Sequence, residues 1–424
     1  MIRLLDKSKI TLFNYFFAFC FIVIYAGCAT KFARELGDIR TLGNAFALGL
    51  TILFVILNRV RFTKEYVAVI GVFLTYALIT VVVYGIMSTW WISVNFLLLT
   101  YGFVLCKSFG KKLPAVFETV LYHMSIISIF FWAIMVISPS ALALIVNTFA
   151  FSEPHTEDGN VVANMIIYTL NDWNFGSNDF IVLLRNPGFA WEPGAFASMI
   201  CLGLFCNMIR TNFRLYKNRA LWVFVFTLLT TQSTTGLMIY IVMLFAWLLY
   251  KRRFLPVILG LFIAAAVFSL PFVQDKLMAE IELTQEVDFL SPGSKNPGRL
   301  MSFLIDWHEF LRHPILGLGC NFEGTWINEQ GLEISTISGI GELLSEYGAI
   351  ITLLFFVMLI RSSRTINKDM GTTKVWVLPI VIIGIMISYS LWRQPIFIAF
   401  WLYCMFSVNP SKESHFVNKF VTSI

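Results

Sequence analysis

The chain has few charged residues. Only 13% of its 424 residues are Asp, Glu, Lys or Arg, whereas a typical soluble domain is about a quarter charged. The apolar share is 58%, which excludes a soluble enzyme built around an ordinary core. Lipid must surround most of the chain, and there each apolar run satisfies its own backbone hydrogen bonds as a helix. We therefore predict an all-α polytopic membrane protein, with one integral membrane domain over residues 1–424.

The sequence predicts neither a disulfide framework nor a cleaved signal peptide. Most of its seven cysteines lie inside apolar runs, where Cys behaves as a small apolar residue. Only Cys28 and Cys320 are placed where they could meet outside the membrane, and we predict no bond between them. The first apolar run follows Arg3, Lys7 and Lys9 as a signal peptide would. Because many spans come later, we interpret it as an uncleaved first helix.

Long apolar runs are what the chain has instead. A helix that crosses a bilayer needs about 20 mostly apolar residues. The run at 220–250 is too long for one untilted helix and carries a polar stretch, so we predict two short spans that meet near Ser233. This gives 12 predicted spans, at residues 10–29, 41–58, 66–86, 88–106, 114–137, 189–209, 220–250 (two), 254–272, 337–360, 375–391 and 396–408.

The distribution of charge predicts the orientation. Of the 31 Lys and Arg residues, 22 fall on the face that carries both termini and 9 on the other. The termini are therefore predicted to be cytoplasmic. Acidic residues run the other way, with 20 of 25 outside and Glu118 near the inner end of the fifth span. The net charge of +6 thus combines a basic inner face with an acidic outer one, and no nucleic-acid partner is expected.

Two extracytoplasmic segments are long enough to build a site, at residues 138–186 and 273–336. The first opens with an apolar helix that we expect to lie on the membrane surface. Long polar segments in a compact protein are usually functional or disordered. Neither segment contains a paired-carboxylate metal motif, so we expect no metal, although Asp172 and Asp179 leave the question open.

The first segment ends in Arg-Asn-Pro-Gly-Phe-Ala-Trp-Glu-Pro-Gly at residues 185–194. Proline suits the first position of a helix, so Glu192 is predicted to cap the sixth span. Arg185 next to the N–H groups of a helix start can hold a phosphate. The alternative is that Glu192 only complements the helix dipole and Arg185 reaches to lipid head groups. The residues alone leave both interpretations open.

The second segment contains an amphipathic stretch at residues 299–313. At 3.6 residues per turn one side is apolar, and we expect it to rest on lipid or on the bundle. The other side is polar, and ordinary solvation is the preferred interpretation for Glu309 and Arg312. Arg299 at the helix entry is a better anion-binding candidate, and His313 can titrate near neutral pH. Pro314, with two glycines after it, is expected to end the helix in a turn.

These patches carry a family resemblance. The residues concerned are the 185–194 run, Gly-Arg at 298–299, Trp307 and Pro-x-Leu-Gly-x-Gly at 314–319. On a chain with 12 predicted spans they resemble the bacterial O-antigen and capsular polysaccharide polymerases, the Wzy-type group of the O-antigen ligase-like superfamily. The order of spans and loops agrees over most of the chain, and the Glu-Pro-Gly element favours polymerase over ligase. In contrast to some members, neither outer segment has an arginine followed ten residues later by glycine, which leaves the individual arginine roles open.

The resemblance implies a GT-C-like, metal-independent glycosyltransferase without a cofactor, at the outer face of the bacterial cytoplasmic membrane. One undecaprenyl-diphosphate-linked glycan would be the donor and a lipid-linked repeat unit the acceptor, with membrane lipids and a chain-length regulator as further partners. Cations aimed at the departing diphosphate would lower the barrier. The predicted diphosphate ligands are Arg185, Arg299 and Arg393. The base candidates, in order of preference, are Glu192, His313 and His308, and the predicted sugar contacts are Trp191, Trp307 and Asn321.

Two other functions fit the same pattern. An O-antigen ligase would share the fold and the donor but use a lipid A core as acceptor. A lipid-linked oligosaccharide flippase, which is a transporter, would also suit 12 spans. Transporters usually place ionisable residues near the middle of the bilayer, whereas here the charges gather at span ends and in outer segments. This distribution favours an enzyme with an outward-facing active site.

Overall fold

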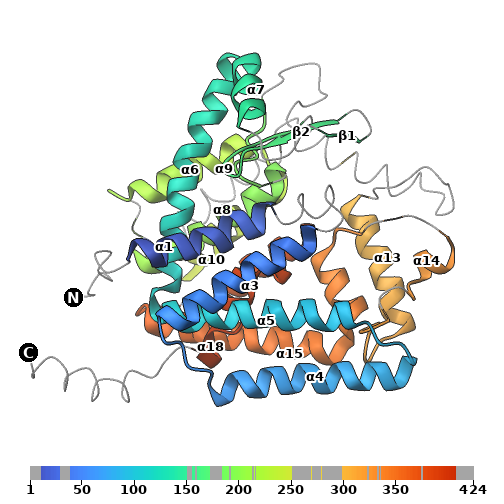
Figure 1. The fold of residues 1–424 in the computed structure, drawn as a ribbon. Helices are drawn as coiled ribbons and strands as arrows, with labels where there is room; N and C mark the ends of the chain where they lie inside the picture. Colours follow the sequence, from blue (N-terminus) through green and yellow to red (C-terminus); the bar gives the residue numbers. More distant parts are fainter. Residues whose placement is uncertain are drawn as a thin grey trace, which may run out of the picture.

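The computed structural model describes most of the chain, and Figure 1 shows its fold. The described residues are 11–28, 39–149, 155–157, 160–171, 184–190, 192–212, 214, 216–250, 269, 278, 298–321, 324–331, 334, 336–373 and 376–406. The predicted span at 254–272 and most of the second extracytoplasmic segment before residue 298 lie outside this set.

Helices dominate the described residues (Figure 1). The first part of the chain forms α1 (Leu12–Phe19), the π-helical η2 (Cys20–Cys28), α3 (Ile39–Leu57), α4 (Lys64–Tyr84), α5 (Thr89–Phe109), the 3-10 turn η3 (Gly110–Lys112), α6 (Leu113–Ile137) and α7 (Pro139–Thr148). The second part forms α8 (Pro193–Arg210), α9 (Arg219–Thr231), α10 (Thr234–Tyr250), α13 (Arg299–Arg312), α14 (Trp326–Glu329), α15 (Gly339–Asp369), α16 (Val377–Ser388), η5 (Leu391–Arg393), α17 (Pro395–Trp401) and α18 (Tyr403–Phe406). The predicted apolar helix at the start of the 138–186 segment is α7.

Helix length and composition support a membrane protein. Within the described residues, four helical runs are long and apolar enough to cross a bilayer: Lys64–Tyr84, Thr89–Ile137, Pro193–Arg210 and Gly339–Asp369. Other apolar helices are shorter. α16 has 12 residues and covers about 18 Å, less than the roughly 30 Å of a hydrocarbon core. The stretch predicted as the last span is divided between α17 and α18. The count of 12 spans stays a prediction.

The long apolar run at 220–250 is divided where the sequence predicts. α9 ends at Thr231 and α10 begins at Thr234, with Gln232 between them in the left-handed conformation at φ 47°. The hydroxyl of Thr231 accepts a hydrogen bond from the backbone N–H of Ser233 at 3.3 Å, and that of Ser233 accepts one from the N–H of Gly236 at 3.2 Å. Short hydroxyl side chains that bond the backbone favour helix ends over helix interiors. The polar stretch therefore separates the two helices.

The 138–186 segment contains strands that the all-α prediction does not include. β1 (His155–Glu157), β2 (Asn160–Asn164) and β3 (Thr169–Asn171) form an antiparallel sheet in the order β1-β2-β3. The pairs His155↔Val162 and Val162↔Asn171 set the register. These strands are short and polar at their ends, so they lack the long alternating pattern that identifies a strand in sequence.

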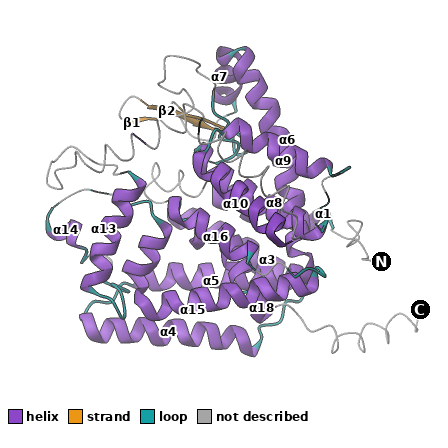
Figure 2. Cartoon of the chain, turned by 180° about the vertical axis from the view of Figure 1, so that it is seen from behind, coloured by secondary structure: helices purple, strands orange, loops and turns teal. Residues whose placement is uncertain are grey.

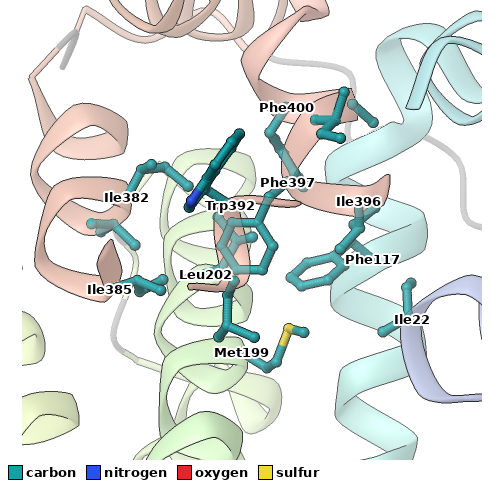
Figure 3. Close-up of a cluster of buried hydrophobic side chains, with 14 of the residues drawn as sticks. Ile22, Phe117, Met199, Leu202, Ile382, Ile385, Trp392, Ile396, Phe397 and Phe400 are labelled. Carbon is teal, nitrogen blue, oxygen red and sulfur yellow. The ribbon is translucent and has the colours of Figure 1, made fainter. Parts of the chain in front are cut away.

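The main core joins the last helices to the middle of the chain. α17 packs on α5, and α8 packs on α6 and α9. Figure 3 shows Phe117 of α6 and Phe397 of α17 facing each other, with Met199 and Leu202 of α8 beside them. All four side chains are buried. In the reverse view, α4, α5 and α15 run alongside one another, and α6 runs away from them toward α7 (Figure 2).

The amphipathic stretch forms helix α13, and part of its polar side is buried against the protein. The polar residues Asp306 and Glu309 are 6% and 4% exposed, because this side packs against α15. The apolar side faces outward, and its exposed residues are Leu300, Leu304, Trp307 and Leu311. The prediction that Glu309 is solvated is therefore wrong. In a chain surrounded by lipid, the apolar side of a helix can face the lipid while the polar side forms contacts within the protein.

The glycine turn after α13 docks that helix onto α15. Gly319 donates its N–H to the carbonyl of Glu346 at 2.8 Å, and Ala349 donates to the carbonyl of Pro314 at 2.8 Å. Gly348 interrupts α15 with φ 69° and ψ −177°. A Cβ atom on Gly317 would lie 2.5 Å from backbone atoms of Glu346. The glycines of the Pro-x-Leu-Gly-x-Gly element thus allow the close backbone approach that fixes α13.

Candidate active site

The loop before α8 is held by Asn186. Its side-chain amide donates to the hydroxyls of Thr230 at 2.9 Å and Ser128 at 3.3 Å, and its carbonyl accepts from the N–H of Gly188 at 3.0 Å. The backbone N–H of Asn186 also bonds the carbonyl of Thr230 at 2.9 Å. Asn186 is fully buried. The asparagine after Arg185 therefore fixes the arginine beside the end of α9, where its Nε donates to the carbonyl of Thr231 at 3.3 Å.

Glu192 is the N-cap residue of α8, as predicted, and Pro193 begins the helix. Its side chain makes no capping hydrogen bond. The carboxylate instead lies beside the side chain of Tyr389, which follows α16. A capping side chain accepts a hydrogen bond from a backbone N–H of the first helical turn. Glu192 makes no such bond, so capping alone does not explain its carboxylate. The carboxylate is directed toward the rest of the site.

Arg299 is the first residue of α13 and reaches the same tyrosine. Its Nη2 donates to the hydroxyl of Tyr389 at 2.6 Å, and its Nη1 donates to the hydroxyl of Thr235 at 3.3 Å. The guanidinium carbon lies 5.0 Å from the centre of the Tyr389 ring. Tyr389 therefore lies beside both Arg299 and Glu192, which come from two patches more than a hundred residues apart in sequence.

Arg185 belongs to the same electrostatic group. Burial lowers the pKa of its guanidinium, the nearby Tyr389 and Glu192 oppose that shift, and the positive charge of Arg299 adds to it. The two arginines are thus close enough to repel each other. Neither forms a salt bridge with the residues described in the structure. Two cations held together with one carboxylate nearby form a favourable place for a further anion.

Two other arginines do have counter-ions. Arg312 bonds Glu329 at 2.8 Å and Glu309 at 3.4 Å. Arg393, the third predicted diphosphate ligand, bonds Glu342 at 2.9 Å and also pairs with Glu346. A diphosphate would have to displace two carboxylates to reach Arg393. The structure thus brings Arg185 and Arg299 together and places Arg393 in a separate, neutralised group.

A second group of carboxylates lies along the buried side of α13. Asp306 packs against the first turn of α15, where a Cβ atom on Gly341 would lie 2.5 Å from its Oδ2. Burial, together with the nearby Glu342 and Glu309 and against a lowering hydrogen bond from Thr336, raises the pKa of Asp306 to about 8. Its Oδ2 is buried without a hydrogen-bond partner among the described residues. At neutral pH this carboxyl group is largely protonated.

The two histidine candidates lie on the far part of α13 and just beyond its end. The Nδ1 of His313 is 3.3 Å from the Tyr84 hydroxyl and its Nε2 is 3.6 Å from Glu309. His308 is exposed, with its ring centre 5.2 Å from that of Trp326. Within the described residues, none of these contacts is with an arginine of the site or with Glu192. Glu192 is the base candidate that the structure places beside the arginines.

The predicted sugar contacts are dispersed. Trp307 is on the outward side of α13, where its ring centre lies 5.1 Å from that of Phe310. Asn321 follows the glycine turn, and its backbone N–H bonds the carbonyl of Leu318 at 2.9 Å. Trp191, Asp172 and Asp179 lie outside the described residues. Sugar binding by these residues stays a prediction.

Two residues of the site, Tyr389 and Thr235, are not indicated by the sequence. Tyr389 ends an apolar run and carries no polar motif. Thr235 belongs to the hydroxyl stretch that divides a long run into two helices. The one local signal is Gly194 in the Glu-Pro-Gly element, since a Cβ atom there would collide with the Tyr389 hydroxyl. A glycine indicates that something approaches closely, but it does not identify the neighbour.

The comparisons with known proteins leave the family open. A scan against protein-family models finds no match to this chain, and a search of curated proteins finds no relative. The geometry of the site is therefore the evidence on which a functional proposal depends.

Proposed function

We propose that the protein is a polysaccharide polymerase, a glycosyltransferase that joins undecaprenyl-diphosphate-linked glycans at the outer face of the cytoplasmic membrane. The observation that supports this proposal is the pair of arginines, Arg185 and Arg299, held together at the start of α8 with no salt bridge to the described residues. A diphosphate supplies the negative charge that would balance these two cations. Arginine also matches phosphate with two parallel hydrogen bonds.

The proposed reaction is a glycosyl transfer that makes use of these charges. A hydroxyl oxygen of the acceptor sugar forms a bond to the anomeric carbon of the donor, and the bond from that carbon to the diphosphate breaks. The electron pair leaves with the diphosphate, where the two guanidinium groups stabilise the growing negative charge. The proton of the hydroxyl passes to a base, and Glu192 is the carboxylate beside the arginines. Asn186 holds the loop that carries Arg185.

The arginines provide the test with purified protein in lipid nanodiscs and lipid-linked repeat units. Arg299→Ala and Arg185→Ala should each lower the rate of polymer formation about a hundredfold or more, the scale seen when a transition-state donor is removed. Arg299→Lys should recover only part of the loss, because a point charge does not replace a planar fork.

Arg312→Ala is the matched control, since Arg312 is at the other end of α13 and is paired with Glu329. It should keep most of the activity. Normal polymer from both the Arg185 and Arg299 variants, at normal levels of folded protein, would exclude the proposed role of the pair.

A glycolipid extract from cells that lack the gene separates polymerase from the two alternatives. Single capped repeat units would support the polymerase. Polymer that is not transferred to lipid A core would indicate a ligase, and precursor that remains on the inner face would indicate a flippase.

A further inference from the structure

Tyr389 occupies a space that the chain leaves open for it. The residue is 5% exposed. A Cβ atom on Gly194 of α8 would collide with its hydroxyl oxygen, and one on Gly339 of α15 would lie 2.5 Å from its carbonyl oxygen. Its backbone N–H bonds the carbonyl of Ile385 at 2.9 Å. Glycines on two different helices therefore allow the tyrosine to enter, and α16 fixes its backbone.

The hydroxyl of Tyr389 stands between a cation and an anion. It accepts from Nη2 of Arg299 at 2.6 Å, and it lies against Gly194 at the start of α8, beside the carboxylate of Glu192. A phenol that accepts from a guanidinium has its own proton available to donate to a carboxylate. The resulting chain runs from Arg299 through Tyr389 to Glu192, and hydrogen bonds in such a chain strengthen one another.

The residue before Tyr389 supports the same arginine. The hydroxyl of Ser388 is 2.8 Å from that of Thr235, and Thr235 accepts from Nη1 of Arg299 at 3.3 Å. Both terminal nitrogens of the guanidinium are therefore oriented by the end of α16, one directly and one through Thr235. The plane of the guanidinium is set before any ligand arrives, which reduces what its ordering costs on binding.

We propose that Tyr389 is a positioning residue that fixes Arg299 and Glu192 relative to each other, so that the diphosphate ligand and the base act in one geometry. This inference rests on the proposed function. When a reacting group is displaced by about 1 Å, the reaction rate can fall about a hundredfold. One hydroxyl that holds both groups is thus a sensitive point of the site, although it touches no reacting atom.

Tyr389→Phe tests the inference, because it keeps the ring and removes the hydroxyl. With lipid-linked repeat units, kcat should fall about tenfold or more. In the absence of repeat units, the protection of the protein by inorganic pyrophosphate against thermal unfolding should need severalfold more pyrophosphate. Tyr403→Phe is the matched control: Tyr403 is also buried and donates to a carboxylate, that of Asp369, at 3.0 Å. It should change neither quantity.

A double-mutant cycle separates positioning from packing. If Tyr389 acts partly through Glu192, adding Tyr389→Phe to Glu192→Gln should slow the enzyme by a smaller factor than Tyr389→Phe slows the wild type. Losses that simply multiply would overturn the coupling, and so would a Tyr389→Phe protein with the kcat and pyrophosphate response of the wild type. Wild-type protein that responds to pyrophosphate but makes no polymer would refute the proposed function, while the pyrophosphate comparison would still decide whether Tyr389 positions Arg299.

Discussion

At the scale of single residues, the arginines near the site differ in their counter-ions. Arg312 and Arg393 each meet two carboxylates, whereas Arg185 and Arg299 meet neutral oxygens of Thr231, Tyr389 and Thr235. A neutral oxygen orients a guanidinium without cancelling its charge. Arginines of the second kind keep most of their attraction for a phosphate, which makes partner identity a better guide to function than position in a loop.

The role of Glu192 can be separated from that of the histidines. Glu192→Gln keeps the shape of the N-cap residue but cannot accept a proton, so transfer should slow about a hundredfold, on the scale of general-base removal. Binding of lipid-linked substrate should persist. Rates measured with purified enzyme decide the matter. If Glu192→Gln polymerises normally while His313→Ala or His308→Ala is inactive, a histidine takes the catalytic role.

Asp306 predicts an unusual pH dependence of stability. Its folded-state pKa is about 8, against an ordinary value of 3.8. The folded protein therefore holds a proton that the unfolded chain has lost between about pH 4 and pH 8. This contribution to stability is fully present below that window and disappears as the pH rises through it, by at most about 1.4 kcal/mol per pH unit.

Asp306→Asn should flatten this dependence. The measurement is the unfolding temperature of the detergent-solubilised protein from pH 5 to pH 8. Asp369→Asn removes a carboxylate that bonds Lys111 at 3.0 Å, far along α15 from Asp306, and should leave the slope unchanged. An equal slope in the wild type and in Asp306→Asn would show that another group controls the dependence.

At the scale of elements, the break in α15 fixes the place of α13. Gly348 has φ 69°, and a Cβ atom on it would collide with the carbonyl oxygen of Ile315. Gly348→Ala combines backbone strain with a clash against a backbone that cannot move aside. It should lower the unfolding temperature and, because Arg299 is carried by α13, polymer formation as well.

Gly371→Ala is the control for the strain alone. Gly371 has nearly the same φ, 67°, but a Cβ atom there would have no neighbour within 4 Å. It should cost about 1 kcal/mol of stability, and Gly348→Ala several times as much. If the two variants have the same unfolding temperature, the close approach of Gly348 to Ile315 does not contribute to stability.

The sequence predicts where the helices of this protein begin and end better than it predicts which side of each helix is buried. The division of the 220–250 run follows from its hydroxyl residues, and the start of α8 follows from Pro193. The buried side of α13 does not follow, because a period of 3.6 residues shows that two sides differ without showing which one meets the protein. Tyr389 escapes prediction for a related reason: its importance comes from contacts with three distant segments, which no local pattern records.

At the scale of the whole molecule, ion pairs join residues that the charge distribution assigns to one face. Glu118 bonds Arg210, and Lys111 bonds Asp369; all four are predicted to lie toward the inner side. The site residues Arg185, Glu192 and Arg299 are predicted to lie on the outer side and are found together. The pairing agrees with the predicted sorting of loops.

Reporter fusions test the predicted orientation. A reporter placed after Asn174 or Glu282, both outside the described residues, should be extracytoplasmic, and one placed after Lys217 or Lys368 should be cytoplasmic, because 22 of the 31 basic residues lie on the predicted inner face. Activities of alkaline phosphatase and β-galactosidase fusions give the two readouts. If the fusions after Asn174 and Glu282 are cytoplasmic and those after Lys217 and Lys368 are extracytoplasmic, the site lies on the cytoplasmic side, which contradicts the proposal.

The outward apolar side of α13 has a consequence for the substrate concentration that the protein meets. Leu300, Leu304 and Leu311 face outward, while Arg299 at the start of the same helix faces the site. Under the proposed function, a donor anchored by an isoprenoid tail would approach this helix by diffusion within the plane of the bilayer. Its effective concentration is then a number per unit area. Adding buffer to a vesicle suspension leaves that density unchanged, whereas adding inert phospholipid dilutes it.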